Sequence, residues 1–406
     1  MDKQAIESKQ LLVNWVFTPA SPIVTRDLFF GRVEQLNKVI DAINERGQHA
    51  VLYGERGVGK TSLANIINES LKGILTAKVT CNRTENFTDI WKKMFKRVSF
   101  IAKSPGTGFT AVESEKTIQL DLFLPKEEEV DSTDILAVFE NLSNPVLFIF
   151  DEFDSVKDPK TQVRFADTIK ALSDNAPHAT LLVVGIAESI NELIGDHPSI
   201  ERCIKQIKLP RMSSTELSEI IDNGLARLEM QIDPLVRRDI IDFSEGFPHY
   251  THLLTKFTAK TALQFGTLEI NRSHFDLAIE EALDNVRESI RESYQRAVIT
   301  TRKEAMFDDV LSACALAKED EHGTFRATDL EKPLYKVTGK HLNLQAYIYH
   351  LGKLCQDERG GILQKIGFGK QHRYRFANPL LKAFVRIKLY QSGKLSKANS
   401  NNKKSA

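Results

Sequence analysis

The sequence predicts an α/β fold built on a parallel sheet, followed by an all-helical unit and a smaller third unit. Short apolar runs in the first half alternate with helical patterns, as strands and helices do in such a fold. The runs are apolar throughout, which is typical of parallel strands covered on both faces. After Pro210 the strands disappear, and β-rich runs return only within residues 360–376. A chain of 406 residues, 42% hydrophobic and 27% charged, is long enough for two or three packed domains.

The first strand candidate leads into a glycine-rich loop. The stretch VLYGERGVGKTSLANII, residues 51–67, passes from an apolar run through three glycines to Lys60 and Thr61, and then into apolar residues at helical spacing. The backbone amides of such a loop can converge on a phosphate chain. The spacing is that of the Walker A motif GxxxxGK[ST], in which the lysine reaches the β and γ phosphates and the threonine ligates magnesium. The expected nucleotide-binding residues are Gly54, Glu55, Arg56, Gly57, Val58, Gly59, Lys60, Thr61 and Ser62.

The next candidates continue the alternation. The strand candidate ILTAKVTC precedes the helix candidate FTDIWKKMFKRV, and the apolar run PVLFIF precedes the helix candidate VRFADTIKALSD and the strand candidate ATLLVVGIA. Between residues 101 and 130 the pattern changes to the alternation of a hairpin. This change predicts an insertion on the sheet domain.

A second motif follows the apolar run at residues 146–150. The segment VLFIFDEFD delivers Asp151 and Glu152 to the carboxyl end of a buried parallel strand, where ligand sites of α/β sheets form. This arrangement is typical of Walker B. We expect Asp151 to bind Mg²⁺ together with Thr61. Glu152 is expected to act as the general base toward the attacking water, and Lys60 is expected to take part in catalysis at the phosphates. Asp154 is interpreted as an exposed acid at a helix start.

The order of motifs resembles an AAA+ ATPase of the origin-recognition and STAND-related branch. The segments that carry the resemblance are LFFGRVEQLNKVIDAI, the Walker A loop, FIFDEFD, LLVVGIAES, HPSIERCIKQIKLPRMSSTEL and EGFPHYTHLL, and together they cover about residues 20–300. The resemblance implies a P-loop NTPase domain with a helical lid, ATP and Mg²⁺ as cofactors, and a homo-oligomer. The absence of an NKxD guanine-reading motif in the sequence favours ATP over GTP.

The resemblance also implies roles at and around the nucleotide. The segment from Pro22 to Arg32, with Gly31, would wrap the adenine. Arg202 in SIER corresponds to a finger arginine that reaches the γ phosphate of a neighbouring subunit, with Arg211 in reserve. A surface arginine near a helix end is the alternative for Arg202.

Two departures from the family pattern concern its γ-phosphate sensors. After the fourth strand the sequence offers Ser189, in GIAES, as the candidate sensor. The lid turn GFP places Pro248 beside the nucleotide by resemblance, but His249 stands where some relatives carry an arginine. We expect His249 to pack within the lid.

The C-terminal region has the element order of a winged helix. Helices are expected at about 303–317, 328–338 and 343–355, followed by a hairpin with a Gly-Lys tip and a last helix. From residue 340 onward there are 14 Lys and Arg against 2 Asp and Glu, which favours double-stranded DNA as a partner, mainly through its phosphates. The candidate DNA-binding residues are Lys365, Lys370, His372, Arg373 and Arg375. Tyr374 and Phe376 are expected to pack the hairpin, and docking of a partner protein is the alternative use of this module.

Composition limits the remaining classes of function. The four cysteines are far apart and form no CxxC pair, which argues against a structural zinc site and a disulfide framework. The N-terminus carries early acids and no long apolar stretch, so we expect a cytoplasmic protein without a membrane segment. Residues 303–406 hold 19 Lys and Arg against 10 Asp and Glu, whereas residues 1–302 hold 36 against 44. The basic charge therefore gathers in the C-terminal module.

These observations predict four regions: an AAA+ domain at 1–209 with its insertion at about 101–130, a lid at 210–300, a winged helix at 301–391 and a disordered basic tail at 392–406. Two functions stay open. The first is an ATP-hydrolysing protein that oligomerises and engages DNA through the winged helix. The second is a STAND-like signalling switch, in which nucleotide exchange controls recruitment of an effector protein without DNA binding.

Overall fold

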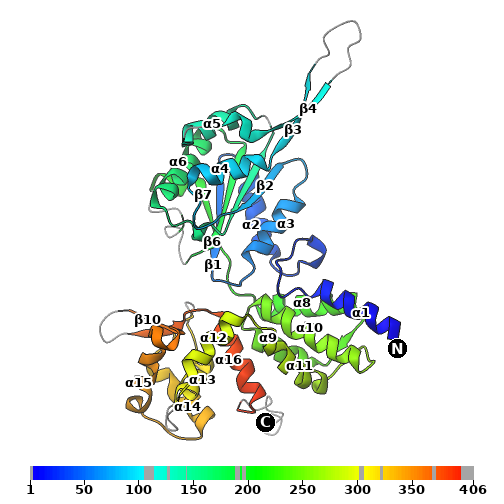
Figure 1. The fold of residues 1–406 in the computed structure, drawn as a ribbon, viewed down its shortest axis with the longest axis vertical. Coiled ribbons are helices and arrows are strands. Elements are labelled where there is room, and N and C mark those ends of the chain that lie inside the picture. Colours follow the sequence, from blue (N-terminus) through cyan, green and yellow to red (C-terminus); the bar gives the residue numbers. More distant parts are fainter. Residues whose placement is uncertain are drawn as a thin grey trace, which may run out of the picture. The chain divides into compact units, whose positions relative to one another are not determined.

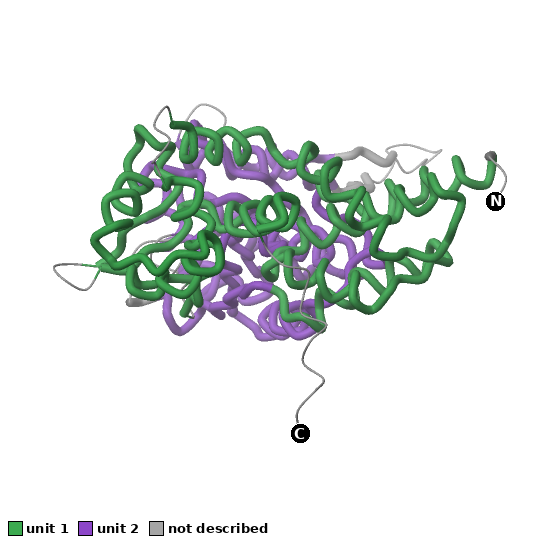
Figure 2. The backbone as a smooth tube through the Cα atoms, turned by 90° about the horizontal axis from the view of Figure 1, so that it is seen from below, with its two compact units in different colours: residues 1–20, 212–406 green, residues 21–211 purple. Residues whose placement is uncertain are grey.

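The computed structural model describes residues 3–104, 114–125, 129–142, 144–187, 193, 198–300, 306–320, 323–367 and 372–394. The chain forms two compact units, residues 21–211 and residues 1–20 with 212–406, which Figure 2 colours separately. The expected first domain begins at residue 1, whereas the structure groups residues 1–20 with the C-terminal half. No helix in the described ranges combines the length and the apolar character that a membrane span requires.

Residues 21–211, unit 2 of Figure 2, contain the predicted parallel sheet, which is confirmed with five strands (Figure 1). Their order is β2-β5-β6-β1-β7, and every neighbouring pair is parallel. The strand β6 therefore lies between the strands that carry the two motifs. The bounds are β1 His49–Gly54, β2 Leu75–Thr80, β5 Val146–Asp151, β6 Ala179–Ile186 and β7 Ile204–Lys208.

Helices pack on this sheet, as Figure 1 shows. One group joins α4, α5 and α6, which contact one another, and another joins α2 and α3. Around α4 the core is aromatic: Trp91 is fully buried and lies within 6.4 Å, centroid to centroid, of rings from β5 and α6. The bounds are α2 Val33–Asn44, α3 Lys60–Ser70, α4 Phe87–Lys96, α5 Ser132–Glu140 and α6 Pro159–Asn175. Short 3-10 turns occur at η1 Arg26–Leu28, η2 Leu120–Phe123, η3 Phe153–Ser155 and η4 Pro198–Cys203.

The expected hairpin is present at the insertion. The strands β3, Ser99–Ser104, and β4, Ser114–Gln119, pair antiparallel and form a sheet of their own (Figure 1). The alternating pattern therefore corresponds to a hairpin that is separate from the parallel sheet.

Residues 1–20 with 212–406, unit 1 of Figure 2, contain the lid helices. They are α8 Ser214–Arg227, α9 Pro234–Ser244, α10 Pro248–Gln264 and α11 Arg272–Asp284, with a two-residue strand pair, β8 Gln231–Ile232 and β9 Glu269–Ile270, that the all-helical prediction omitted. The N-terminal helix α1, Lys3–Val16, packs on α10. Val13, Val16 and Phe17 are buried there, and a Cβ on Gly224 of α8 would lie 2.4 Å from the Phe17 ring. This contact is the physical reason that residues 1–20 join the C-terminal half.

The C-terminal elements follow the expected order. They are α13 Phe307–Leu316, η5 Ala327–Leu330, α14 Glu331–Thr338, α15 Leu344–Leu354, η6 Asp357–Arg359, the antiparallel strands β10 Leu363–Ile366 and β11 Arg373–Phe376, and α16 Leu380–Gln391. The preceding helix, α12 Glu288–Val298, lies within the range expected for the lid. Phe325 forms an isolated antiparallel bridge to β11 through two backbone hydrogen bonds with Tyr374. Tyr374 and Phe376 are buried, which confirms that they pack the hairpin.

The last helix, α16, is tied to the lid. The Tyr250 hydroxyl donates to the Leu380 carbonyl at 2.8 Å, and Lys382 forms ion pairs with Glu245 at 2.8 Å and Glu319 at 3.1 Å. Lys382 is buried, so these pairs are shielded from solvent. The lid and the C-terminal module therefore pack as parts of one compact unit.

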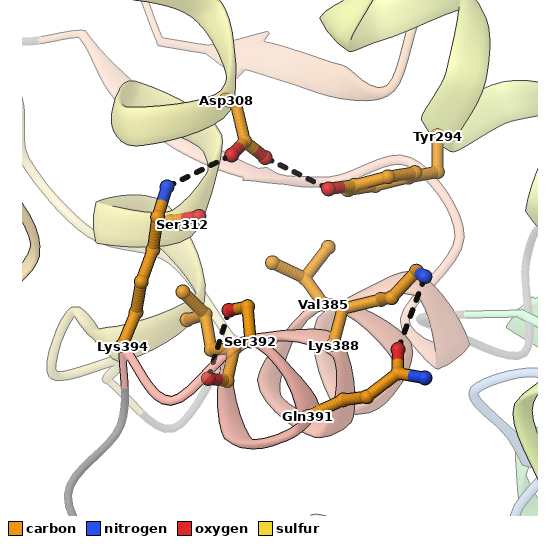
Figure 3. Close-up of a pocket in the computed structure, with 9 residues that line it drawn as sticks. Tyr294, Asp308, Ser312, Val385, Lys388, Gln391, Ser392 and Lys394 are labelled. Carbon is orange, nitrogen blue, oxygen red and sulfur yellow. Dashed lines mark hydrogen bonds and ion pairs between the residues drawn. The ribbon is translucent and has the colours of Figure 1, made fainter. Parts of the chain in front are cut away.

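A pocket of about 360 Å³ opens beside α16, between α12 and α13 (Figure 3). Its central carboxylate, Asp308, accepts the Tyr294 hydroxyl at 2.8 Å on one oxygen and faces the Lys394 ammonium at 3.1 Å on the other. Both carboxylate oxygens are thus used within the chain. We interpret this pocket as a packing space between α12, α13 and α16 whose polar groups bind one another.

Candidate nucleotide-binding site

The glycine loop between β1 and α3 has the backbone conformation that its sequence requires. Gly54, Gly57 and Gly59 have φ angles of 153°, 88° and 97°, a region that side chains disfavour. A Cβ on Gly54 would lie 2.4 Å from the Leu209 carbonyl oxygen. The turn therefore depends on glycine both for its dihedral angles and for the close approach of the backbone.

Lys60 opens α3 with its side chain folded over this loop. Its ammonium donates to the carbonyl oxygens of Gly54 at 2.9 Å and Glu55 at 2.7 Å. Burial lowers the pKa of Lys60 to about 8, against the opposing effect of the nearby Asp154 and Asp151 carboxylates. The cation is thus held within the loop, where a phosphate chain can replace the carbonyls as its partner.

The structure brings the two motifs together at Thr61 and Asp151. The Thr61 hydroxyl donates to Asp151 Oδ1 at 3.3 Å, although 90 residues separate the two positions. Asp151 ends β5, and α3 packs across β5 and β6. A hydroxyl and a carboxylate are hard oxygen donors of the kind that Mg²⁺ selects. These residues therefore fit a magnesium ion beside the phosphate loop.

Glu152 follows directly and has a strained backbone. Its φ angle is 55°, in the left-handed region, and its N–H donates to Asp151 Oδ1 at 3.0 Å. Such a conformation costs roughly 1–3 kcal/mol for a non-glycine residue and is frequent at functional sites. The side chain is exposed to solvent, where it can bind a water molecule.

Asp154 differs from its expected role. It is half-buried, and its Oδ1 accepts the N–H of Ile186 at 2.8 Å. A Cβ on Gly185 would lie 3.2 Å from this carboxylate. Asp154 therefore joins the ends of β5 and β6. It lies in the first turn of the 3-10 helix η3, as expected for a helix-start acid, but the expected exposure was wrong.

Arg32 and Arg211 contact the glycine loop, and Arg32 ends residues 22–32, the adenine segment of the sequence prediction. Arg32 is buried with a φ angle of 63°, directly after Gly31 at 71°, and its guanidinium donates to the carbonyls of Val58 and Pro210. Arg211, the reserve finger candidate, donates from Nε to Glu55 at 2.7 Å within the same chain. These contacts connect the phosphate loop to the segment that leaves β7.

The other residues expected at the nucleotide do not all lie at the glycine loop. Ser62 accepts the Ile23 N–H at 3.1 Å, which holds the start of the adenine segment on α3, while Arg56 is exposed at the loop. Ser189 lies outside the described residues. Pro248 is the first residue of α10 and belongs to the other compact unit.

His249 packs as expected. Its Nδ1–H donates to the Pro19 carbonyl at 2.8 Å, and burial lowers the pKa of its imidazole. Both residues belong to the same compact unit.

Arg202 lies at the amino end of the sheet. Its carbonyl accepts the Gln48 side-chain amide at 3.0 Å, just before β1, whereas the phosphate loop follows β1. A strand of this length spans about 20 Å. The guanidinium pairs with Asp174 at 2.7 Å, and 68% of the side chain is exposed. Arg202 is thus directed away from the phosphate loop of its own chain.

The candidate DNA-binding residues differ in accessibility. Lys365 is exposed on β10, and His372 Nδ1 lies 3.2 Å from the Gly367 carbonyl. Arg373 pairs with Asp320 at 2.9 Å, and Arg375 donates to Gln364 at 2.9 Å. Lys370 lies outside the described residues.

Sequence reasoning missed one residue of the site, Lys78 on β2. Its ammonium lies 2.8 Å from Asp151 Oδ2. The only signal in the sequence is a lysine between Ala77 and Val79, both buried, in the strand candidate ILTAKVTC.

Several solved structures of ATPases and DNA-associated proteins are similar to this chain. A Walker-type ATPase from Pyrococcus abyssi, PABY2304, is 15% identical with a TM-score of 0.53, over 91% of this chain and 99% of that chain. The ORC1 protein of Aeropyrum pernix, solved in complex with DNA, is 15% identical with a TM-score of 0.49, over 93% and 96%. The RuvB Holliday junction branch migration motor of Thermotoga maritima is 14% identical with a TM-score of 0.44, over 90% and 97%. No curated protein matches.

The likeness to the Pyrococcus ATPase shows the fold alone. The family rests on a match of residues 23–332, most of the chain, to the model of novel STAND NTPase 1. The matched range includes the glycine loop with Lys60 and the Asp151-Glu152 pair. This chain therefore belongs to the novel STAND NTPase 1 family of nucleotide-binding, P-loop proteins.

Proposed function

We propose that this protein binds and hydrolyses ATP with Mg²⁺, assembles into a homo-oligomer and engages double-stranded DNA through a C-terminal winged helix. The observation that carries the ATPase part is the contact between the Thr61 hydroxyl and Asp151, with Glu152 directly after it. A glycine loop alone could bind any anion. A hydroxyl, a buried carboxylate and an exposed carboxylate beside that loop are the groups needed for a metal-assisted attack by water.

Each residue has a separate task in this proposal. The loop amides and Lys60 hold the phosphates, with Lys60 giving up its two carbonyl partners. Thr61 and Asp151 would hold Mg²⁺, which neutralises charge on the β and γ phosphates when bound. Glu152, whose side chain is exposed to solvent, accepts a proton from water.

The change Glu152→Gln tests turnover. It removes the general base and keeps the size of the side chain, so ATP binding should persist while phosphate release falls at least a hundredfold. Titration calorimetry and a phosphate-release assay measure the two properties. The control is Glu69→Gln, which makes the same change at an exposed position near the end of α3. Phosphate release by Glu152→Gln at the rate of the unsubstituted protein would remove Glu152 from the mechanism.

Support for an oligomer comes from Arg202. The residue is exposed at the end of the sheet opposite the phosphate loop, so it can act on a γ phosphate only in another chain. DNA binding is supported by the element order of the C-terminal module, by the bridge between Phe325 and its hairpin, and by its excess of Lys and Arg.

A specific observation favours the second function, a STAND-like switch that recruits a protein. Arg373 and Arg375, two of the expected phosphate contacts, form side-chain interactions within the C-terminal module. A module that uses its arginines internally presents fewer cations to DNA. The salt dependence of duplex binding by a hairpin variant separates the two functions.

A further inference from the structure

Lys78 lies at the centre of a chain of polar contacts that the Walker motifs do not include. Lys78 is opposite Ile149 in the sheet register, so its side chain is on the same face as Asp151, two residues further along β5. The ammonium lies 2.8 Å from Asp151 Oδ2 and also donates to Asn65 Oδ1 on α3. A lysine from the neighbouring strand thus neutralises the carboxylate expected to hold the metal.

The contacts around this pair use both oxygens of the carboxylate. Oδ1 accepts the Thr61 hydroxyl, and Oδ2 faces Lys78. Thr61 and Asn65 are four residues apart on α3 and therefore share one face of the helix. The Asn65 amide in turn donates to the Ile23 carbonyl at 3.2 Å. The lysine is fixed from two elements, and its ammonium has a defined position beside the carboxylate.

The charge of this pair matters because both groups are shielded from water. The Asp151 side chain is 3% exposed and that of Lys78 15%. Charges a few ångströms apart in such surroundings interact several times more strongly than in water. A nucleotide bound at the loop brings further negative charge toward Asp151, and this repulsion must be offset.

We propose that Lys78 is a positioning residue that supplies a built-in counter-charge to Asp151, so that the site holds nucleotide phosphates even when Mg²⁺ is scarce. The proposal rests on the proposed function, because it assumes a nucleotide at the glycine loop. Mg²⁺ offsets the same negative charge when present, so Lys78 matters most without it. The nucleotide affinity of the unsubstituted protein therefore depends only weakly on Mg²⁺.

The test compares ATP dissociation constants in saturating Mg²⁺ and in excess EDTA. For the unsubstituted protein we expect the constant to rise less than about tenfold on removal of Mg²⁺. For Lys78→Met we expect a further rise of at least about tenfold in EDTA, with a much smaller change in Mg²⁺. The readout is binding, so it does not depend on turnover.

Three further variants separate charge from structure. Lys78→Arg keeps the charge and should keep the small EDTA effect. The double variant Lys78→Met with Asp151→Asn removes both charges and should recover most of the affinity that Lys78→Met loses in EDTA. Lys205→Met makes the same substitution on β7, at the opposite edge of the sheet, and should leave the ratio of the two constants unchanged.

The outcomes distinguish this inference from the proposed function. The role of Lys78 would be overturned if Lys78→Met raised the ATP dissociation constant by the same factor in Mg²⁺ and in EDTA. It would also be overturned if the double variant recovered no affinity. Either result would leave ATP binding intact. Failure of the unsubstituted protein to bind ATP with Mg²⁺ would overturn the proposed function, and the inference with it.

Discussion

At the scale of single residues, spacing along the chain predicted motif residues that the fold brings together. Lys60, Thr61 and Asp151 lie together because Asp151 ends β5, while the other two follow the glycine loop after β1 at the same carboxyl edge of the parallel sheet. Lys78 was missed because its role depends on the register between β2 and β5, which are far apart in sequence. Asp154 was misjudged for a similar reason, since its partner Ile186 ends a different strand.

Arg202 gives a prediction at this scale. An exposed ion pair such as that with Asp174 contributes little to stability, so the guanidinium is available to a second chain at low cost. We expect Arg202→Ala to bind ATP normally and to release phosphate at least tenfold more slowly. Mixing it with Lys60→Ala should restore part of the activity, because an intact Arg202 then meets an intact loop.

Arg46→Ala is the matched control for this experiment, since Arg46 is also exposed and lies between α2 and β1. Its phosphate release should equal that of the unsubstituted protein. A protein that stays monomeric with ATP, and whose activity per chain is independent of concentration, would contradict a role of Arg202 in trans.

At the scale of elements, local patterns predicted strands, helices and hairpins better than they predicted which elements pack together. The alternation expected between residues 101 and 130 corresponds to the antiparallel pair of β3 and β4, and the β-rich runs near the C-terminus also form an antiparallel pair. The packing of α1 on α10 was not anticipated. Its buried residues Val13, Val16 and Phe17 form too short a pattern to indicate a partner about two hundred residues later.

The C-terminal hairpin decides between the two proposed functions. Arg373 is unsuitable for a charge reversal, because a glutamate there would face Asp320. We therefore choose Lys365→Glu with Arg375→Glu. If the hairpin contacts DNA phosphates, this double variant should weaken duplex binding for every sequence alike and reduce the slope of log affinity against log salt by about two.

Fluorescence anisotropy with labelled duplexes over a salt series measures this effect. The control is Lys332→Glu with Lys336→Glu, two exposed positions on α14 of the same module. Duplex binding by the hairpin variant at the affinity of the unsubstituted protein would exclude the hairpin as the DNA contact. Recruitment of a protein would then be the better function for this module.

At the scale of the whole molecule, the phosphate site and the basic excess belong to different compact units. The site lies within residues 21–211, and residues 303–406 hold the excess of Lys and Arg. The sequence predicted this division because the motifs and the charges are local features. It could not predict that residues 1–20 join residues 212–406 in one unit, which depends on the contact between Phe17 and Gly224.

The central claim is that ATP binds at the glycine loop, and its most direct test is titration calorimetry with ATP and Mg²⁺. We predict one ATP per chain for the unsubstituted protein and for Lys72→Ala, which removes an exposed lysine just beyond α3. Lys60→Ala should lose about a hundredfold or more in affinity, since charge-assisted contacts to phosphate are lost. Equal affinity for Lys60→Ala and the unsubstituted protein, or no binding by either, would contradict the claim.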